Sequence, residues 1–417
     1  MSKCYDFTMS LPGGFWILAL AQGLMAAGYA ISFPFLAVYL NSHRGMPMSW
    51  VGAFLAGSML LSSLARFLGG EISDAVGRRK VMVYSLWVRA LVVSAIAWVI
   101  YARAPLWQIF VLHPLSGFIG SLFDPAAQSW VADYTHPAGR IKAYGFLRVG
   151  TNAGWAVGPA LGGFLASGSY ALMFVITAAV TAVCAAILAL SVRDLPGAAT
   201  GRAPEAGFYG AVRALSDGAF LRFCVFAFMT TAVMSQLVVS TSLYSRAYLG
   251  MGEGEIGLLF SINGLMVVFF QYFVTRLLEG RRLTAGLAAG AVCYAAGYLF
   301  FGYSPSFFFA AAAFVVVTLG ELAMSPAMQA LGANMAPHGA KGRYLGVQGV
   351  FQQVGRAFGI FVGSNAVGSI SPLFREGPWF IIAFLALTAG AGFLSLGRRL
   401  TLEQDGLKGP SPVPTPT

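Results

Sequence analysis

Charged residues inside long apolar stretches are the side chains of this sequence with the clearest potential for chemistry. Two acids, Asp124 and Glu321, interrupt runs that are otherwise almost entirely apolar. The same kind of run contains four arginines: Arg66, Arg89, Arg148 and Arg356. Inserting such a charge at the centre of a membrane helix costs about 2.5–3.5 kcal/mol. A charge retained at that cost usually marks a transport pathway or a paired site.

Depth within the apolar stretches predicts which of these charges meet. With a rise of about 1.5 Å per residue, Asp124 lies roughly 10 Å from the inner boundary of its helix. Three arginines lie at the same level: Arg66, Arg89 and Arg148. Glu321 and Arg356 both lie roughly 20 Å deep, near the midplane. Their matched depth on adjacent helices predicts an ion pair.

Asp124 is the first candidate for a group that binds and releases a proton. Burial raises the proton affinity of a carboxylate and a neighbouring arginine lowers it, so a conformational change can alter both. The alternative is a permanent ion pair that holds helices together. Glu321 could couple to protons, bind a cationic substrate or simply pair with Arg356. His113, in the outer half of its helix, is expected to supply a hydrogen bond more than a proton step.

The elements that must position these charges are membrane helices. The chain is 58% hydrophobic and 10% charged, whereas soluble domains carry roughly 25% charged residues. Stretches of about 20 apolar residues are long enough to cross a bilayer as helices. Twelve such stretches follow one another: 14–40, 49–72, 80–102, 105–132, 141–167, 169–192, 220–249, 254–278, 283–303, 305–334, 342–370 and 377–397. The first is too long for a cleaved signal and is expected to be retained.

The chain also resembles itself. Residues 123–128 (FDPAAQ) recur 201 positions later as residues 324–329 (MSPAMQ), and the register continues without a gap for about forty residues. Glycines match within it: 145, 154, 158 and 162 fall on 346, 355, 359 and 363. Duplicated halves that run in the same sense predict two six-helix bundles related by an axis along the membrane normal, with a substrate site between them.

Polar segments and basic residues divide and orient the bundles. We expect an N-terminal bundle at 1–192, a cytoplasmic linker at 193–218, a C-terminal bundle at 219–400 and a disordered tail at 401–417. If both termini are cytoplasmic, the internal loops and ends carry eighteen Lys and Arg against four outside. This positive-inside bias predicts the topology and accounts for the net charge of +11 without a nucleic-acid partner.

Two motifs make the sequence resemble the major facilitator superfamily of transporters. The loop from Gly70 to Lys80, GEISDAVGRRK, is similar to the family's Gly-x3-Asp-(Arg/Lys)-x-Gly-Arg loop. The fifth stretch is similar to a pattern that the family associates with antiporters, through Gly154, Gly158, Pro159, Gly162 and Gly163. The branch that it resembles most is the drug:proton antiporters. Two departures are Ala75, where the loop usually has a basic residue, and His113, where these antiporters usually have an arginine.

The resemblance implies a conformational latch at the cytoplasmic side. Its residues would be Gly70, Asp74, Gly77, Arg78 and Asp133. Asp74 would face the positive end of a neighbouring helix, and Arg78 would reach Asp133. The cluster would form only when the halves close on the inside. In the fifth stretch, the glycines at four-residue spacing form a smooth face for close helix packing, and Pro159 bends the helix.

The resemblance also implies a cavity lined by helices of both halves. Polar and aromatic candidates there are Gln22, Tyr29, Asn152, Trp155, Gln236, Asn263, Gln352 and Gln353. Isolated amides among apolar side chains suit amphiphilic substrates of variable shape. Any of these groups could instead bond between helices.

We therefore expect an all-α protein of twelve transmembrane helices that is a secondary transporter and not an enzyme. The expected activity is proton-coupled export of amphiphilic small molecules across the bacterial inner membrane, by a monomer with protons, substrate and lipid as its partners. The alternative is transport of an anionic metabolite or a metal-chelating natural product. The scattered histidines and the cysteines without ligand spacing predict no metal site, and nothing in the sequence predicts a cofactor.

Overall fold

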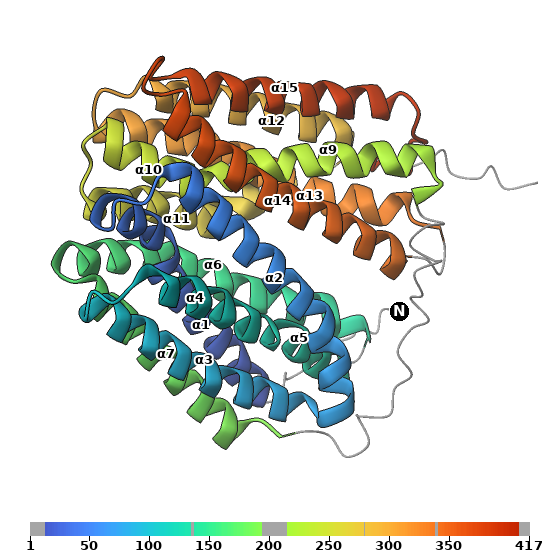
Figure 1. Ribbon diagram of the computed structural model, residues 1–417. Coiled ribbons are helices and arrows are strands. Elements are labelled where there is room, and N and C mark those ends of the chain that lie inside the picture. Colours follow the sequence, from blue (N-terminus) through green and yellow to red (C-terminus); the bar gives the residue numbers. More distant parts are fainter. Residues whose placement is uncertain (1–12, 135–136, 194–214, 279, 338–340, 408–417) are drawn as a thin grey trace, which may run out of the picture. The chain divides into compact units, whose positions relative to one another are not determined.

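Helices make up nearly all of the computed structural model, which describes residues 13–134, 137–193, 215–278, 280–337 and 341–407 (Figure 1). Those residues contain no strand. Every one of the twelve predicted apolar stretches coincides with a helix or with a helix broken once. The predicted all-α class with twelve long helices is therefore confirmed.

Ten of the stretches are continuous helices. They are α1 (Gly13–Val38, extended by a π turn at Tyr39–His43), α2 (Met48–Val76), α3 (Arg78–Tyr101), α6 (Pro137–Gly168), α7 (Tyr170–Ser191), α11 (Glu253–Leu278), α12 (Leu283–Gly302), α13 (Phe307–Met335), α14 (Lys341–Ser369) and α15 (Gly377–Gly397). The fourth stretch breaks into α4 (Leu106–Ser121) and α5 (Phe123–Tyr134). The seventh breaks into α9 (Gly218–Met234), a 3₁₀ turn at Ser235–Leu237 and α10 (Val239–Tyr248).

Pro125 explains the break between α4 and α5. It has no N–H, so it cannot continue the helical hydrogen bond to the carbonyl of Ser121. A proline is well tolerated in the first turn of a helix, where the N–H groups have no helical partner. The chain accordingly ends one helix at Ser121 and starts the next at Phe123.

Membrane-crossing length and apolarity are found for ten of the twelve helical stretches in the described part of the chain. The two others are α6 and α14, which are 32 and 29 residues long. They are long enough, but glycines and polar side chains lower their hydropathy. These are the two helices that carry the repeated glycines, and the protein as a whole is a multi-pass membrane protein.

The chain folds into two compact units. The first comprises residues 1–32 and 61–203, and the second comprises residues 33–60 and 204–417. The boundary near residue 203 lies inside the predicted linker, of which residues 194–214 fall outside the described part. Residues 33–60, which we predicted in the N-terminal bundle, belong to the second unit. There, a Cβ added at Gly52 would lie 2.5 Å from the Ser364 Cβ, so the missing side chain lets α2 approach α14 closely.

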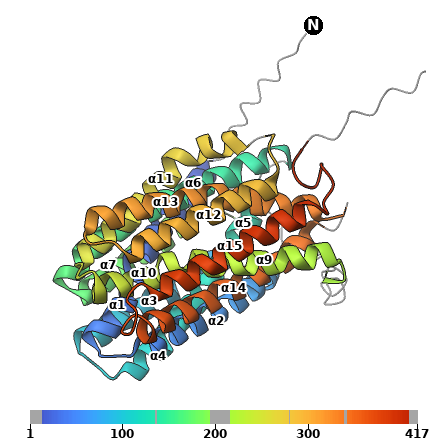
Figure 2. The same ribbon diagram turned by 90° about the horizontal axis from the view of Figure 1, so that it is seen from above.

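In the first unit, α3 lies beside α7 (Figures 1 and 2). Its buried core is formed by apolar side chains from α1, α3, α5 and α7, among them Phe15, Leu86, Phe123 and Trp130. The Trp130 indole is stacked on Tyr134 with ring centroids 4.1 Å apart and donates a 2.9 Å hydrogen bond to the Arg193 carbonyl. A large aromatic ring is thus buried together with its one polar atom.

In the second unit, α15 packs against both α12 and α9 (Figure 2). The fully buried Trp379 of α15 contacts aromatic rings of α12 and α10. Its ring is stacked on Tyr298 at 5.6 Å and meets Tyr244 and Phe301 edge-on, at 5.1 and 5.0 Å. Stacked and edge-on aromatic pairs are each worth about 0.5–1.5 kcal/mol beyond their buried area. This cluster ties three helices of the unit together.

The repeated glycines form equivalent helix contacts in the two units. In the first, a Cβ at Gly154 would overlap the Gly23 carbonyl oxygen of α1, and one at Gly158 would lie 2.7 Å from the Ala27 carbonyl oxygen. In the second, Cβ atoms at Gly355 and Gly359 would overlap the carbonyl oxygens of Phe228 and Ala232 in α9. We call these contacts, α6 on α1 and α14 on α9, the glycine seams. Their equivalence is what a duplicated bundle requires.

The start of the predicted disordered tail is folded, which corrects that expectation for residues 401–407. Asp405 is 1% exposed and accepts hydrogen bonds of 2.9 Å from both the backbone N–H and the hydroxyl of Thr284. Thr284 lies in the first turn of α12, so this carboxylate caps a helix that has no cap in its own sequence. The Pro-rich residues 408–417 lie outside the described part.

Candidate functional site

The first candidate site is built around Asp124, at the start of α5. Asp124 lies in the first turn of that helix, where the positive end of the helix dipole stabilises a carboxylate. Its Oδ2 forms an ion pair with Nη2 of Arg66 on α2, at 3.4 Å. The two side chains are 37% and 52% exposed, so the carboxylate is not sealed inside the core. An acid that must gain and lose a proton requires such access.

Close packing of α2 on the α4–α5 break positions this pair. A Cβ at Gly69 would lie 2.9 Å from Cγ of Pro125 and 3.0 Å from Cα of Leu122. Further along α4, a Cβ at Gly117 would lie 2.6 Å from the Ser62 hydroxyl. Because these glycines lack side chains, α2 contacts the backbone of the broken helix, and Arg66 is brought within reach of Asp124.

Arg89 of α3 enters the same cluster. Asp124 and Tyr29 are close enough to its guanidinium to interact with it electrostatically, and so are Cys184 and His113. The Arg89 Nε is buried and has no hydrogen-bond partner in the described part of the chain. The structure thus joins two of the four charges that depth placed at one level, Arg66 and Asp124, in an ion pair, and it places Arg89 close enough to Asp124 for an electrostatic interaction. Arg148, the fourth, is exposed on α6 and makes no ion pair with a described residue.

The second candidate site lies around Glu321 on α13. Its Oε2 accepts a 2.8 Å hydrogen bond from Nδ2 of Asn263 on α11, and the same amide nitrogen donates to the Thr318 hydroxyl at 3.0 Å. Tyr294 and Tyr298 of α12 are close enough to the Glu321 carboxylate to interact with it electrostatically. Sequence reasoning singled out both Glu321 and Asn263 without joining them. Arg356, the predicted partner, is exposed on α14 and close enough to interact electrostatically with Tyr294.

Sequence reasoning missed Gln271 of α11, which compensates for a proline. Pro326 lies inside the continuous helix α13 and cannot donate to the Leu322 carbonyl, four residues earlier. The Gln271 side chain supplies the missing donor: its Nε2 donates to the Leu322 carbonyl oxygen at 3.0 Å, an ordinary N–H···O distance. Pro125, the counterpart of Pro326 in the repeat, lies instead at a helix break. The signal in the sequence was a proline in the middle of a long apolar stretch. It leaves one carbonyl without a helical donor, which a polar side chain such as Gln271 on a neighbouring helix can supply.

Comparison with known protein families decides which family this chain belongs to. The family model described as "Major Facilitator Superfamily" matches residues 18–360. The chain belongs to the major facilitator superfamily. The resemblance found in the loop and glycine motifs is therefore confirmed for most of the chain.

Relatives of this major facilitator with similar sequences are transporters. It is 28% identical to "Uncharacterized MFS-type transporter YqjV" of Bacillus subtilis, over 92% of each chain. It is 26% identical to "Multidrug resistance protein MdtH" of Aeromonas hydrophila, over 90% of this chain and 93% of that one. It is also 25% identical to the "Na(+), Li(+), K(+)/H(+) antiporter" of Planococcus maritimus, over 85% and 88%.

Solved structures support the same fold. A POT family transporter crystallised with 5-aminolevulinic acid superposes with a TM-score of 0.78 at 14% identity, covering 93% of this chain and 96% of that one. The nucleoside transporter NupG, as its D323A mutant, gives 0.75 at 13% identity, covering 92% and 99%. At such low identity these likenesses establish the architecture alone.

The loop motif of this major facilitator brings two of its predicted latch residues together. Arg78 Nε lies 3.4 Å from Asp133 Oδ2, and the Arg78 Nη1 donates a 2.9 Å hydrogen bond to the Ser73 hydroxyl. Gly77, between α2 and α3, has φ of 110°, a conformation that favours glycine. The environments of Gly70 and Asp74 lie outside the described part, so the full latch stays a prediction.

The predicted cavity residues of this major facilitator have different surroundings. Tyr29 and Trp155 meet edge-on with ring centroids 5.9 Å apart. Gln22 has a buried Oε1 with no hydrogen-bond partner among the described residues. Gln352 is 3.1 Å from the Met328 sulfur. Asn152 and Gln353 are partly exposed, on α6 and α14.

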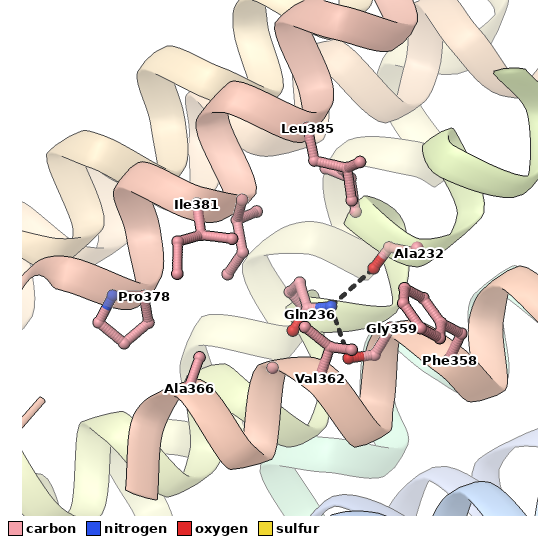
Figure 3. A pocket seen from close by; sticks show the side chains of 12 residues that line it. Ala232, Gln236, Phe358, Gly359, Val362, Ala366, Pro378, Ile381 and Leu385 are labelled. Atoms are coloured by element: carbon pink, nitrogen blue, oxygen red, sulfur yellow. Dashed lines mark hydrogen bonds between the residues drawn. The ribbon is translucent and has the colours of Figure 1, made fainter. Parts of the chain in front are cut away.

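Gln236 is the clearest case of an amide used between helices. It is 3% exposed, and its Nε2 donates to the carbonyls of Ala232 at 2.7 Å and Gly359 at 2.8 Å (Figure 3). Its Oε1 accepts from the Ser240 hydroxyl at 2.6 Å. These bonds join α9 to α14 at the glycine seam. All but one of the hydrogen-bonding positions of Gln236 are occupied by protein groups, and its role in a substrate cavity stays a prediction.

A small pocket adjoins Gln236 and is lined by α9, α14 and α15 (Figure 3). Phe358, Val362, Ile381 and Leu385 supply most of its apolar wall. Its volume of about 20 Å³ is enough for about one water molecule. It is much too small for a drug-sized ligand, which needs about 300 Å³ or more.

Proposed function

We propose that this major facilitator is a proton-driven exporter of amphiphilic small molecules that works by alternating access. The observation that carries the proposal is the carboxylate of Asp124, ion-paired with Arg66 at 3.4 Å and facing a second arginine, Arg89. A carboxylate held by cations is ionised, and a rearrangement that separates them favours its protonation. Alternating access would supply that rearrangement twice in each cycle.

A relative and two aromatic cavity candidates support the choice of substrate and direction. The MdtH relative is named as a multidrug resistance protein. Tyr29 and Trp155, two of the cavity candidates, are aromatic and meet edge-on. Such a surface binds apolar bodies of varied shape and selects weakly by hydrogen bonding. The proposed location is a bacterial inner membrane, with both termini cytoplasmic as the basic residues predict.

The Arg78–Asp133 ion pair is the proposed cytoplasmic latch. Its distance of 3.4 Å and partial burial, with 12% and 27% of the side chains exposed, give it more weight than a free surface pair. In this proposal the pair is made in one conformational state and broken in the other. Its loss would therefore shift the balance between states without removing a core contact.

Reconstituted vesicles test the proposal. The purified protein would be placed in liposomes with an imposed pH gradient and a fluorescent amphiphilic cation, ethidium. We expect accumulation that follows the gradient and collapses with a protonophore. Asp124→Asn should still exchange ethidium down its gradient but should not accumulate it. Wild-type flux that ignores both the gradient and the protonophore would contradict proton coupling.

The same experiment separates coupling from anchoring. If the Asp124–Arg66 pair only holds helices together, Asp124→Asn should lower thermal stability by leaving Arg66 without its counter-charge, and Arg66→Gln should restore it. Arg148→Gln is the matched control, because that arginine makes no ion pair with a described residue. A stability loss with rescue, and unchanged accumulation, would assign the pair a structural role.

A second candidate function is transport of an anionic metabolite or a metal-chelating natural product. The observation that favours it is the charge of the first cluster, in which Arg66 and Arg89 face one acid, Asp124, among the described residues. The net positive charge would attract an anion. Replacing ethidium by the amphiphilic anion anilinonaphthalene sulfonate decides between the two. Gradient-driven uptake of the anion alone would favour this alternative.

A further inference from the structure

Arg89 occupies a space that the sequence keeps open for it. A Cβ added at Gly120 of α4 would lie 2.8 Å from both Cδ and Nη1 of Arg89, and 2.9 Å from its Cζ. The guanidinium therefore lies directly on the backbone of α4, where any side chain other than hydrogen would displace it. Glycine inside a helix lowers helix stability relative to other residues. At position 120 it also leaves the space that the Arg89 guanidinium occupies.

The surroundings of the guanidinium leave it incompletely paired. Its Nε is buried and lacks a hydrogen-bond partner among the described residues. The groups that face it come from four helices: Tyr29 on α1, His113 on α4, Asp124 on α5 and Cys184 on α7. Of these, Asp124 is the acid. Its ion pair is with Arg66, which approaches from α2.

The repeat matches position 120 with a charged residue of the second unit. Continued three residues upstream, the 201-residue register sets Gly120 against Glu321. In the second unit the charge at this position belongs to α13 itself, and Tyr294 of α12 faces it. In the first unit the position is empty, and the charge comes from α3, the neighbouring helix.

We propose that Arg89 is the second partner of the Asp124 carboxylate and that Gly120 positions it. In this proposal, which rests on the proton coupling proposed above, the ionised carboxylate is shared between Arg66 and Arg89. Taking a proton from water neutralises Asp124 and releases both arginines. Returning the proton to water restores the negative charge and the ion pair. Arg89 is thus a positioning residue that sets the pH at which the carrier loads.

The pH profile of transport tests this role. Arg89→Gln removes a cation that favours the ionised carboxylate, so the pH of half-maximal gradient-driven uptake should move upward by about one unit or more. Arg89→Lys, which retains the charge, should recover part of the shift. Arg148→Gln removes an arginine that makes no ion pair with a described residue, and it should leave the profile unchanged. Equal profiles for wild type and Arg89→Gln would overturn the proposal.

Gly120→Ala should displace the Arg89 guanidinium and so tests its role by an independent route. It should shift the profile in the same direction as Arg89→Gln, and the double variant should shift it no further, because both act through one guanidinium. Gly57→Ala, where a Cβ would have open space, is the matched control. Additive shifts in the double variant would refute the role of Gly120. Wild-type uptake without any pH dependence would instead refute the proposed function, so the two failures are distinguishable.

Discussion

Replacing Gly359 by alanine tests whether the glycine seams hold helices together by backbone contact. In the α14–α9 seam the new Cβ would lie 2.7 Å from the Ala232 Cα and would overlap the Ala232 carbonyl and the Ser235 hydroxyl. Two of these three atoms are backbone, so α9 must move. Overpacking of this kind costs about 1–3 kcal/mol. The gain in helix propensity from glycine to alanine, about 1 kcal/mol, offsets only part of it.

A second glycine on the same helix gives the opposite expectation. A Cβ at Gly349 meets nothing within 4 Å, so Gly349→Ala keeps the propensity gain of about 1 kcal/mol. The two variants should therefore differ by about 1–3 kcal/mol in the free energy of unfolding, with Gly359→Ala the less stable. Unfolding in detergent micelles titrated with sodium dodecyl sulfate, followed by tryptophan fluorescence, would measure it. Equal stability would refute the close backbone contact.

Three further changes have defined outcomes. Asp405→Ala removes the cap of α12 and should lower the free energy of unfolding by about 1–2 kcal/mol, while Glu403→Ala, an exposed neighbour, should have little effect in the same assay. Gln271→Leu leaves the carbonyl freed by the mid-helix proline without a partner, and should cost about 1–3 kcal/mol; a fully stable variant would show that water or another group replaces it. Arg78→Ala should reduce uptake into proteoliposomes at unchanged expression and increase cysteine labelling of the cavity from the cytoplasmic side, whereas unchanged labelling, with Asp133→Asn behaving like wild type, would argue against a latch.

The sequence predicted the elements well because membrane helices are specified by local composition. Each apolar stretch is long enough to cross a bilayer. A helix is the regular structure in which a single segment can make all of its backbone hydrogen bonds there. The repeat also anticipated the two glycine faces. The breaks near Leu122 and Ser235 were not predicted, since a proline such as Pro125 breaks one helix, whereas Pro326 is accommodated in another by a side chain from α11.

The sequence predicted which residues lie in the candidate site better than it predicted which of them pair with one another. Depth along a helix axis correctly gathered Arg66, Arg89 and Asp124. It ignored the reach of a long side chain, so it separated Arg89 from His113, with which the guanidinium interacts electrostatically. It also placed Arg148 in the cluster, whereas that side chain is exposed on α6 and makes no ion pair with a described residue. Depth is local, whereas the direction of a side chain depends on how helices pack.

The folded end of the chain has a practical consequence for anyone purifying this protein. Asp405 lies only two residues before the last described residue, Leu407, and it holds the first turn of α12 through Thr284. An affinity tag joined after residue 407 leaves this attachment intact. Shortening the chain to residue 400 would instead expose the start of a membrane helix in the second unit.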